Sequence, residues 1–211
     1  MEPLVAHSER EWILIGMAES CTTRGYERTT VADVCAAAGV ERDRFEELFG
    51  DMDACIAAAT EMALAEARMQ IAAVYFPVKP WAAAVHDGGV ALLGLLAERP
   101  ALARMVLIEA PSSGGRAAEL YAEGKRELQS FVERGRDEAP AESEVPASAG
   151  RGALAGAEGM IVGEILADRT RQLGERARDV AYMLTVPYLG QDEALRQAGR
   201  EGAFRHLRAV A

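Results

Sequence analysis

The sequence has no excess of positive charge, few cysteines and no long apolar run. Lysine and arginine together number 23 against 33 aspartate and glutamate residues, which gives the 211-residue chain a formal net charge of −10. Such a chain does not hold DNA or an anionic membrane through overall basicity, so any contact with DNA has to be local. The longest apolar candidate, residues 89–97, falls far short of the roughly 18 residues that span a bilayer, and no membrane contact is expected.

Secretion, metal and catalytic signals are also missing. The first residues, MEPLVAHSEREW, lack a basic segment followed by an apolar one, so we expect a cytoplasmic protein. Cys21, Cys35 and Cys55 are an odd number without a CxxC pair and fall at apolar helical positions, which favours core packing over a disulfide, a zinc site or redox sensing. The three histidines do not cluster, and the short motifs of metalloproteases, nucleotide-binding loops and serine hydrolases are absent. We therefore expect the protein to bind no metal and no cofactor, and to have no enzymatic activity.

Helical periodicity is what the sequence does have. Apolar residues recur at spacings of three and four, without alternating β-branched runs, so the chain is predicted to be all-α. Ser8 with Glu11 and Thr30 with Asp33 form two capping boxes, each of which starts a helix. Helices are expected at residues 8–24, 31–37 and 42–49, then from Asp51 or Asp53 to the Pro77 and Pro80 pair, and at 81–97, 100–109, 115–137, 154–173 and 175–189, with a weaker segment at 192–207 and a mobile loop at 138–152.

Residues 10–59 carry a more specific pattern. Two short helices flank AAAGV, with RGYERTTVADV before them and FEELFGDMDAC after them. Gly25-Tyr26, Thr29-Thr30-Val31, Ala38-Gly39-Val40, Phe45 and Leu48-Phe49 stand at spacings that resemble the DNA-binding domain of TetR-family transcriptional regulators. The resemblance covers about a quarter of the chain. Beyond it, RPALARMVLIEA and MLTVPYLGQDEAL are loosely similar to effector domains of some actinobacterial members.

The resemblance implies a helix-turn-helix head over residues 1–53 and a helical effector-binding and dimerisation body over residues 54–211. It also implies that Thr30 contacts a backbone phosphate in addition to capping its helix. Arg42 and Arg44 project from the first turn of the recognition helix, where arginine pairs with guanine edges. We therefore expect Thr30, Arg42 and Arg44 to bind DNA.

The recognition helix departs from the family in its charge. Glu41 replaces a small capping residue, Glu46 a tyrosine and Met52 a lysine, and over residues 1–53 acidic residues outnumber basic ones by more than two to one. Either Glu46 and Glu47 lie on the flank of the helix and pair with Arg42 or Arg44, or the head has lost its DNA affinity.

The body has features suited to a dimer interface and a ligand pocket. Glycines recur at spacings of three and four in residues 152–163, which suggests close helix approach, either across a two-fold axis or within the chain. The predicted dimer interface consists of Gly156, Gly159, Gly163, Tyr182, Val186 and Leu189. The predicted ligand-binding residues are Trp81, His86, Met105, Tyr121 and Met160, each of which could instead be an ordinary core residue.

The functional hypothesis is a homodimeric, ligand-responsive regulator, a repressor released from its double-stranded DNA operator by a small apolar or aromatic effector. The alternative is a protein of the same shape that binds a ligand or a protein partner through its acidic head but no longer binds DNA. The sequence does not choose the effector or the operator.

Overall fold

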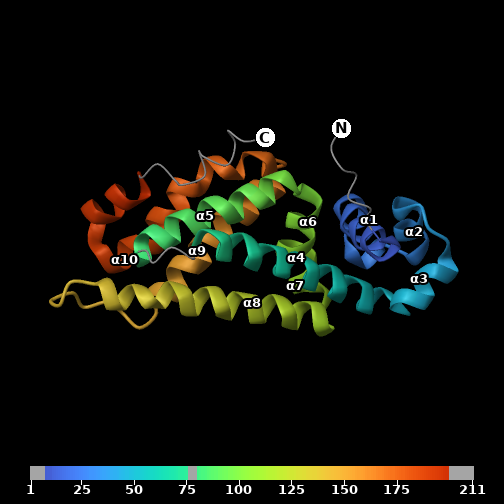
Figure 1. Cartoon of the computed structure of the whole chain (residues 1–211), viewed down its shortest axis with the longest axis horizontal. Helices are drawn as coiled ribbons and strands as arrows, with labels where there is room; N and C mark the ends of the chain where they lie inside the picture. The colour runs from blue at the N-terminus through green and yellow to red at the C-terminus, as the bar shows by residue number, and fades with distance from the viewer. Residues whose placement is uncertain (1–7, 76–79, 200–211) are drawn as a thin grey trace. The chain divides into compact units, whose positions relative to one another are not determined.

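A computed structural model describes residues 8–75 and 80–199 of the chain, and within them it confirms the all-α prediction (Figure 1). No β-strand occurs in the described ranges. The helices are α1 (Glu9–Arg24), α2 (Val31–Ala38), α3 (Arg42–Phe49), α4 (Met52–Tyr75), α5 (Trp81–Glu98), α6 (Pro100–Arg104), α7 (Ala110–Ser113), α8 (Gly115–Glu133), α9 (Ala149–Leu166) and α10 (Ala177–Ala198). Shorter 3-10 turns are η1 (Tyr26–Arg28), η3 (Arg134–Glu138) and η4 (Thr170–Arg176), and η2 (Met105–Glu109) is a π-helical turn.

The chain divides into two compact units. Unit 1 consists of Met1–Ala65 together with Ala101–Glu123, and unit 2 of Glu66–Pro100 together with Gly124–Ala211. The three-helix head therefore lies within unit 1, which also takes in the first half of α4 and the segment from Ala101 into α8. Two helices, α4 and α8, contribute residues to both units.

The core of unit 1 includes apolar residues from all three helices of the head. Ile13 and Met17 of α1, Val34 of α2 and Phe45 of α3 are all fully buried. Cys21, Cys35 and Cys55 are buried as free thiols, which supports their interpretation as core residues. Burial raises the pKa values of the Cys21 and Cys55 thiols to about 12, so both thiols stay protonated near neutral pH.

Local capping signals place the first helices. The Ser8 hydroxyl accepts the backbone N–H of Glu11 while the Glu11 carboxylate accepts the N–H of Ser8, so the predicted capping box is present. The Asp51 side chain accepts the N–H of Ala54 at 2.8 Å and starts α4. The helix is described as far as Tyr75, and Pro77 lies outside the described residues.

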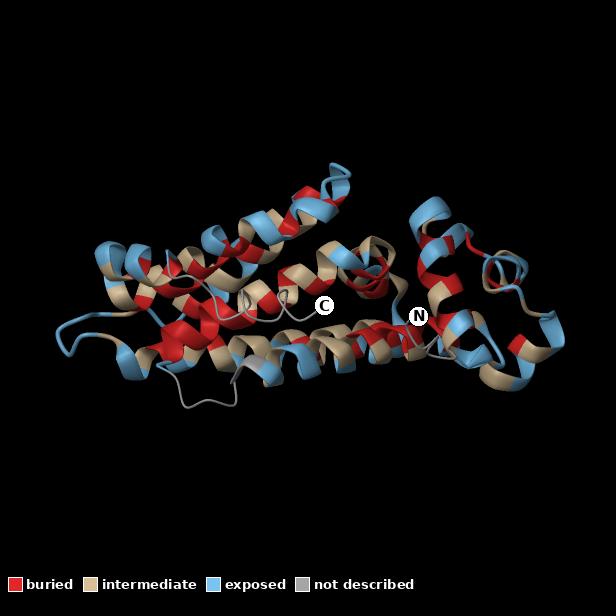
Figure 2. Cartoon of the chain, turned by 45° about the horizontal axis from the view of Figure 1, so that its top comes forward, coloured by how far each residue is buried: buried red, intermediate tan, exposed pale blue. Residues whose placement is uncertain are grey.

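In unit 2, α5 packs against α10 and η4, and α9 packs against α10. Residues 81–88 of α5 are buried without interruption (Figure 2). Trp81 meets Tyr188 of α10 edge to face, with ring centroids 5.2 Å apart. A Cβ atom at Gly135 would lie 2.5 Å from the Trp81 ring, so only glycine fits beside this pair.

Several predicted boundaries in the body were wrong. The helix expected at 154–173 starts earlier, at Ala149, and ends at Leu166, followed by η4. The loop expected over 138–152 is therefore shorter, and Arg136 fastens it by donating to the carbonyls of Val145 and Pro146. The break expected after residue 189 is real, because Gly190 has φ 74° and ψ 171° within α10. The last predicted segment, 192–207, is helical to Ala198 and then runs beyond the described residues.

Candidate functional site

The turn between α2 and α3 has the geometry of a helix-turn-helix. Gly39 adopts the left-handed conformation, with φ 68° and ψ 33°, which ends α2 and lets α3 start three residues later. A Cβ atom at Gly16 of α1 would lie 2.9 Å from the carbonyl oxygen of Val34, so glycine there allows α1 and α2 to pack backbone to backbone. These two glycines fix the direction in which α3 projects.

Thr30 caps α2 as the sequence predicts. Its hydroxyl accepts the N–H of Asp33 at 3.3 Å and donates to the Asp33 carboxylate at 2.7 Å, while that carboxylate accepts the N–H of Thr30. These hydrogen bonds lower the pKa of Asp33. Thr30 is exposed. The capping role is confirmed, and the phosphate contact stays a prediction.

Arg42 lies in the first turn of α3 and pairs with Glu46 one turn further on. Its Nε donates to Glu46 Oε1 at 2.7 Å. This hydrogen bond raises the pKa of the guanidinium, which is charged in any case. The N-cap residue Glu41 makes no capping hydrogen bond with its side chain, as expected for a residue that replaces a small capping residue.

Arg44, two residues along, contacts two carboxylates. Its Nε donates to Glu9 of α1 at 2.6 Å, and its Nη1 donates to Glu47 of α3. Arg44 therefore connects the first and third helices of the head. Together with the Arg42–Glu46 pair, this contact agrees with the first interpretation of the acidic helix, in which Glu46 and Glu47 pair with arginines of the same helix.

The remaining arginines of the head are also engaged. The Arg10 guanidinium lies 5.3 Å from the centre of the Phe49 ring, which is cation–π distance. Arg24 Nε lies 3.4 Å from Asp33, and Arg28 Nε donates to the carbonyl of Arg24. Every arginine between residues 8 and 53 thus has at least one intramolecular partner.

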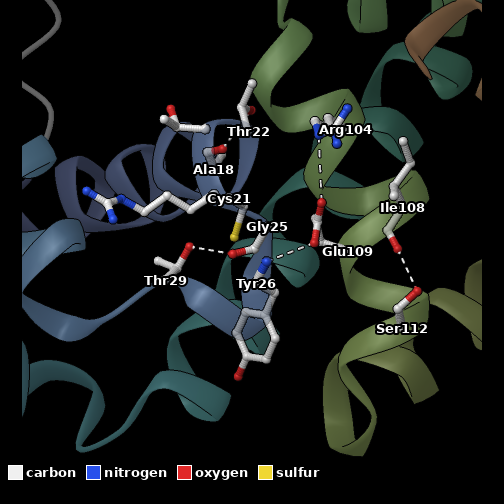
Figure 3. Close-up of polar contacts among 12 residues, drawn as sticks. Ala18, Cys21, Thr22, Gly25, Tyr26, Thr29, Arg104, Ile108, Glu109 and Ser112 are labelled. Carbon is white, nitrogen blue, oxygen red and sulfur yellow. Dashed lines mark hydrogen bonds and ion pairs between the residues drawn. The ribbon is translucent and has the colours of Figure 1, made fainter. Parts of the chain in front are cut away.

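A partly buried carboxylate joins the turn after α1 to the π-helical turn η2 (Figure 3). Glu109 Oε2 accepts the backbone N–H of Tyr26 at 2.8 Å, and its Oε1 lies 3.7 Å from Arg104 Nε. The Tyr26 hydroxyl in turn donates to Asp53 in the first turn of α4. The segment that leads into α2 is therefore attached both to η2 and to α4, and all of these residues belong to unit 1.

A surface cavity of about 180 Å³ lies beside this contact. Its lining includes Arg24, Arg28, Glu109 and Ser112. None of the predicted ligand-binding residues lines it.

The predicted ligand-binding residues fall into both units. Met105 is fully buried in the unit 1 core, and Tyr121 is half-buried against the same core. In unit 2, Trp81 is buried and its Nε1 donates to the carbonyl of Phe131. His86 is buried too, with Nδ1 3.1 Å from the carboxylate of Asp87, whereas Met160 is half-buried on α9. Their role in ligand binding stays a prediction.

Two of the three glycines predicted for the dimer interface have open space beside them. At Gly159 and Gly163 an added Cβ atom would meet nothing within 4 Å, whereas at Gly156 it would lie 3.0 Å from Met183. Gly156, Gly159 and Gly163 are exposed. Among these three glycines, close packing within the chain therefore accounts only for Gly156. The other predicted interface residues, Tyr182, Val186 and Leu189, are half-buried on α10.

Sequence reasoning missed Glu9 and Glu109 as partners in the head. Glu9 is recognisable only as an acidic residue in a first helical turn, and Glu109 lies 83 residues from Tyr26 in the sequence. No local pattern signals either contact, because each joins segments that are brought together only by the fold.

Comparison with known proteins gives the fold a name. No protein-family model and no curated protein matches the sequence. Solved structures do match. FadR of Bacillus subtilis, solved with stearoyl-CoA, is 15% identical with a TM-score of 0.68 over 85% of this chain and 98% of that one. PfmR of Thermus thermophilus, a TetR-family regulator, is 22% identical with a TM-score of 0.64 over 82% of this chain and 96% of that one.

A TetR-family regulator of Bordetella parapertussis is 14% identical with a TM-score of 0.69 over 85% of this chain and 95% of that one. The chain is thus an all-α protein with a helix-turn-helix head. Its fold is that of the TetR-family transcriptional regulators, which confirms at the level of the fold the resemblance seen in residues 10–59.

Membrane-spanning helices and metal centres are both absent from the described residues. No helix in residues 8–75 or 80–199 has the length and apolar character needed to cross a membrane. Within the same ranges, no three His, Cys, Asp or Glu side chains are grouped as metal ligands would be.

Proposed function

We propose that the protein is a homodimeric, ligand-responsive DNA-binding transcriptional regulator, which acts as a repressor and leaves its operator when a small apolar or aromatic effector binds. The observation that carries this proposal is the helix-turn-helix geometry. Thr30 caps α2, Gly39 makes the turn, and Arg42 and Arg44 stand at the start of α3 in a fold that TetR-family regulators share.

The acidic residues of α3 are compatible with this function. Glu46 and Glu47 are each paired with an arginine of the same helix, so their charges are locally offset. DNA binding then exchanges an intramolecular carboxylate for a phosphate or a base edge. Such an exchange releases fewer counterions than the binding of free cations does, so the affinity should depend weakly on salt concentration.

Release by an effector would use the contacts around Tyr26. Since α4 and α8 belong to both units, a change in unit 2 can reach unit 1 along either helix. Asp53 of α4 and Glu109 of η2 both hold Tyr26, so a shift of either would move the start of α2 and with it the recognition helix. A coupling of about 1 to 3 kcal/mol would lower operator affinity by about 5- to 150-fold.

The proposal of an apolar effector rests on the side chains predicted to line the ligand site and on the ligand of one structural neighbour. FadR of Bacillus subtilis was solved with stearoyl-CoA, a ligand with a long apolar chain. Within unit 2, Trp81 and Met160 would supply apolar surface to an effector of related character, and His86 would supply a polar atom.

Dimerisation is supported by the exposed glycines of α9. A second copy of α9 could approach closely where Gly159 and Gly163 leave the backbone uncovered. Two heads on a two-fold axis would read a palindromic site with half-sites about one helical turn apart.

The test is selection of bound sequences from a library of randomised DNA duplexes by the full-length protein, followed by binding measurements. We expect enrichment of one palindromic duplex. We also expect Glu46→Gln to bind the enriched duplex more tightly, because a negative charge beside Arg42 is removed. The matched control is Glu61→Gln, which removes the same charge from an exposed site on α4. Failure to enrich any sequence would contradict the proposal.

A second function is favoured by one observation, the engagement of every arginine between residues 8 and 53 with an intramolecular partner. If these pairs do not exchange, the protein is a ligand- or protein-binding relative without a DNA site. Selection would then enrich no duplex, whereas a bound effector would still raise the Tm measured by thermal unfolding.

A further inference from the structure

The two arginines at the start of α3 have different surroundings, although they are two residues apart. The Arg42 side chain is 70% exposed and that of Arg44 is 40% exposed. Arg42 has one carboxylate partner, on its own helix, whereas Arg44 has two, on two helices. Their capacity to contact DNA therefore differs.

Arg42 keeps the end of its guanidinium available. Only Nε is used, by Glu46, and neither Nη atom donates a hydrogen bond to a residue in the described part of the chain. Two parallel N–H donors are what the N7 and O6 atoms of guanine accept. Exposed pairs between residues one turn apart are weak and exchange readily, so Glu46 can yield to a base without disturbing the helix.

Arg44 has no comparable freedom. Its Nε is bonded to Glu9 and its Nη1 to Glu47, so a guanine that approached either edge would have to displace a carboxylate. The pair with Glu47 lies within α3, as the Arg42–Glu46 pair does, but the pair with Glu9 joins α3 to α1, so Arg44 would have to give up a contact between two helices. The two carboxylates also leave this position with excess negative charge, which repels the phosphates of DNA.

We propose that Arg42 is the residue of α3 that reads a base, and that Arg44 is a positioning residue that holds α3 against α1 through Glu9. This division rests on the proposed DNA-binding function and names the specificity-determining residue within it. It also separates two residues that the sequence pattern treats as equivalent.

The division makes the contact between Glu9 and Arg44 part of the recognition geometry. Glu9 lies in the first turn of α1 and Arg44 in the first turn of α3, and α2 lies between these helices in the sequence. The pair adds a contact that holds the start of α3 against α1, beside the packing that Gly16 and Gly39 allow.

The experiment compares Arg42→Ala with Arg44→Ala in the full-length protein. The probes are the duplex enriched from the randomised library and a scrambled duplex of the same composition, and the readouts are the ratio of the two Kd values and the Tm. For Arg42→Ala we expect the ratio to fall by about 5- to 150-fold with an unchanged Tm. For Arg44→Ala we expect the Tm to fall by about 1 to 4 °C while most of the ratio is kept.

Glu9→Gln tests the Glu9–Arg44 contact without DNA. It should lower the Tm as Arg44→Ala does, and the double variant should lower it little further, because both changes remove the same contact. Additive effects of the two changes would overturn the positioning role. An unchanged ratio for Arg42→Ala, or an equal loss of the ratio for Arg44→Ala at unchanged Tm, would overturn the reading role.

These outcomes are separate from failure of the proposed function. If the wild-type protein enriches no duplex, the regulator proposal and the reading role of Arg42 both fall. The double-mutant cycle of Glu9→Gln and Arg44→Ala, measured by the Tm, would still confirm or overturn the contact between α1 and α3.

Discussion

Substitution of Gly135 by alanine should destabilise unit 2 strongly. The added Cβ would lie 2.5 Å from Trp81 Cη2 and 2.7 Å from Tyr188 Cδ2, whereas carbon atoms in contact prefer about 3.5 to 4.0 Å. Neither ring can easily withdraw, because Trp81 is held by its hydrogen bond to the Phe131 carbonyl and Tyr188 is 1% exposed. Relief of this overlap requires a shift of about 1 Å in a close-packed region.

Overpacking of this kind costs about 1 to 3 kcal/mol, and two constrained aromatic rings place Gly135→Ala at the upper end. For a chain of this length, about 3 kcal/mol corresponds to a fall in Tm of roughly 6 to 12 °C. The fall in Tm is measured by thermal unfolding, monitored by far-UV circular dichroism. The matched control is Gly94→Ala in α5, where a Cβ meets nothing within 4 Å and the helix should gain about 0.5 to 1 kcal/mol. A Gly135→Ala Tm at or above the wild-type value would refute the reasoning.

Three further predictions follow from single contacts. Burial raises the thiol pKa values of Cys21 and Cys55 from 9.0 to about 12, so both should react with a thiol reagent near neutral pH only after denaturation, and rapid labelling of the native protein would contradict this protection. Because of the same shift, the free energy of unfolding should fall as the pH rises from 9.0 towards about 12. Glu109→Ala leaves the Tyr26 N–H without its acceptor and should cost about 1 to 3 kcal/mol in chemical denaturation, whereas Glu109→Gln, which keeps an acceptor oxygen, should cost less; equal losses would argue against the hydrogen bond. Gly159→Leu should shift the proposed dimer to monomer in sedimentation velocity with little change in helix content, and a dimer that is unchanged by this substitution would place the interface elsewhere.

The helices of the head could be predicted because their signals are local. Ser8 with Glu11 and Thr30 with Asp33 each satisfy the N–H groups of their own helix, and Gly39 is required by a left-handed backbone. The pairing of Arg42 with Glu46 is equally local, one turn apart on one helix.

The ends of the body helices could not be predicted as well. Nothing in the sequence marks the end of α9 at Leu166, where Asp168 takes a positive φ of 56° that glycine or asparagine usually adopts. The contacts of Glu9 with Arg44 and of Glu109 with Tyr26 depend on how distant segments pack, so periodicity carries no information about them. Gly135 is a similar case, since its two aromatic neighbours come from α5 and α10.

The most direct test of the central claim is fluorescence anisotropy of the wild-type protein on labelled DNA from upstream of its own coding sequence, beside a scrambled duplex, over a series of salt concentrations. The account predicts preference for the upstream duplex, with a shallow dependence of affinity on salt because Arg42 exchanges the carboxylate of Glu46 for DNA. Equal affinity for the two duplexes at the lowest salt concentration would contradict it and would leave the fold without a DNA-binding function.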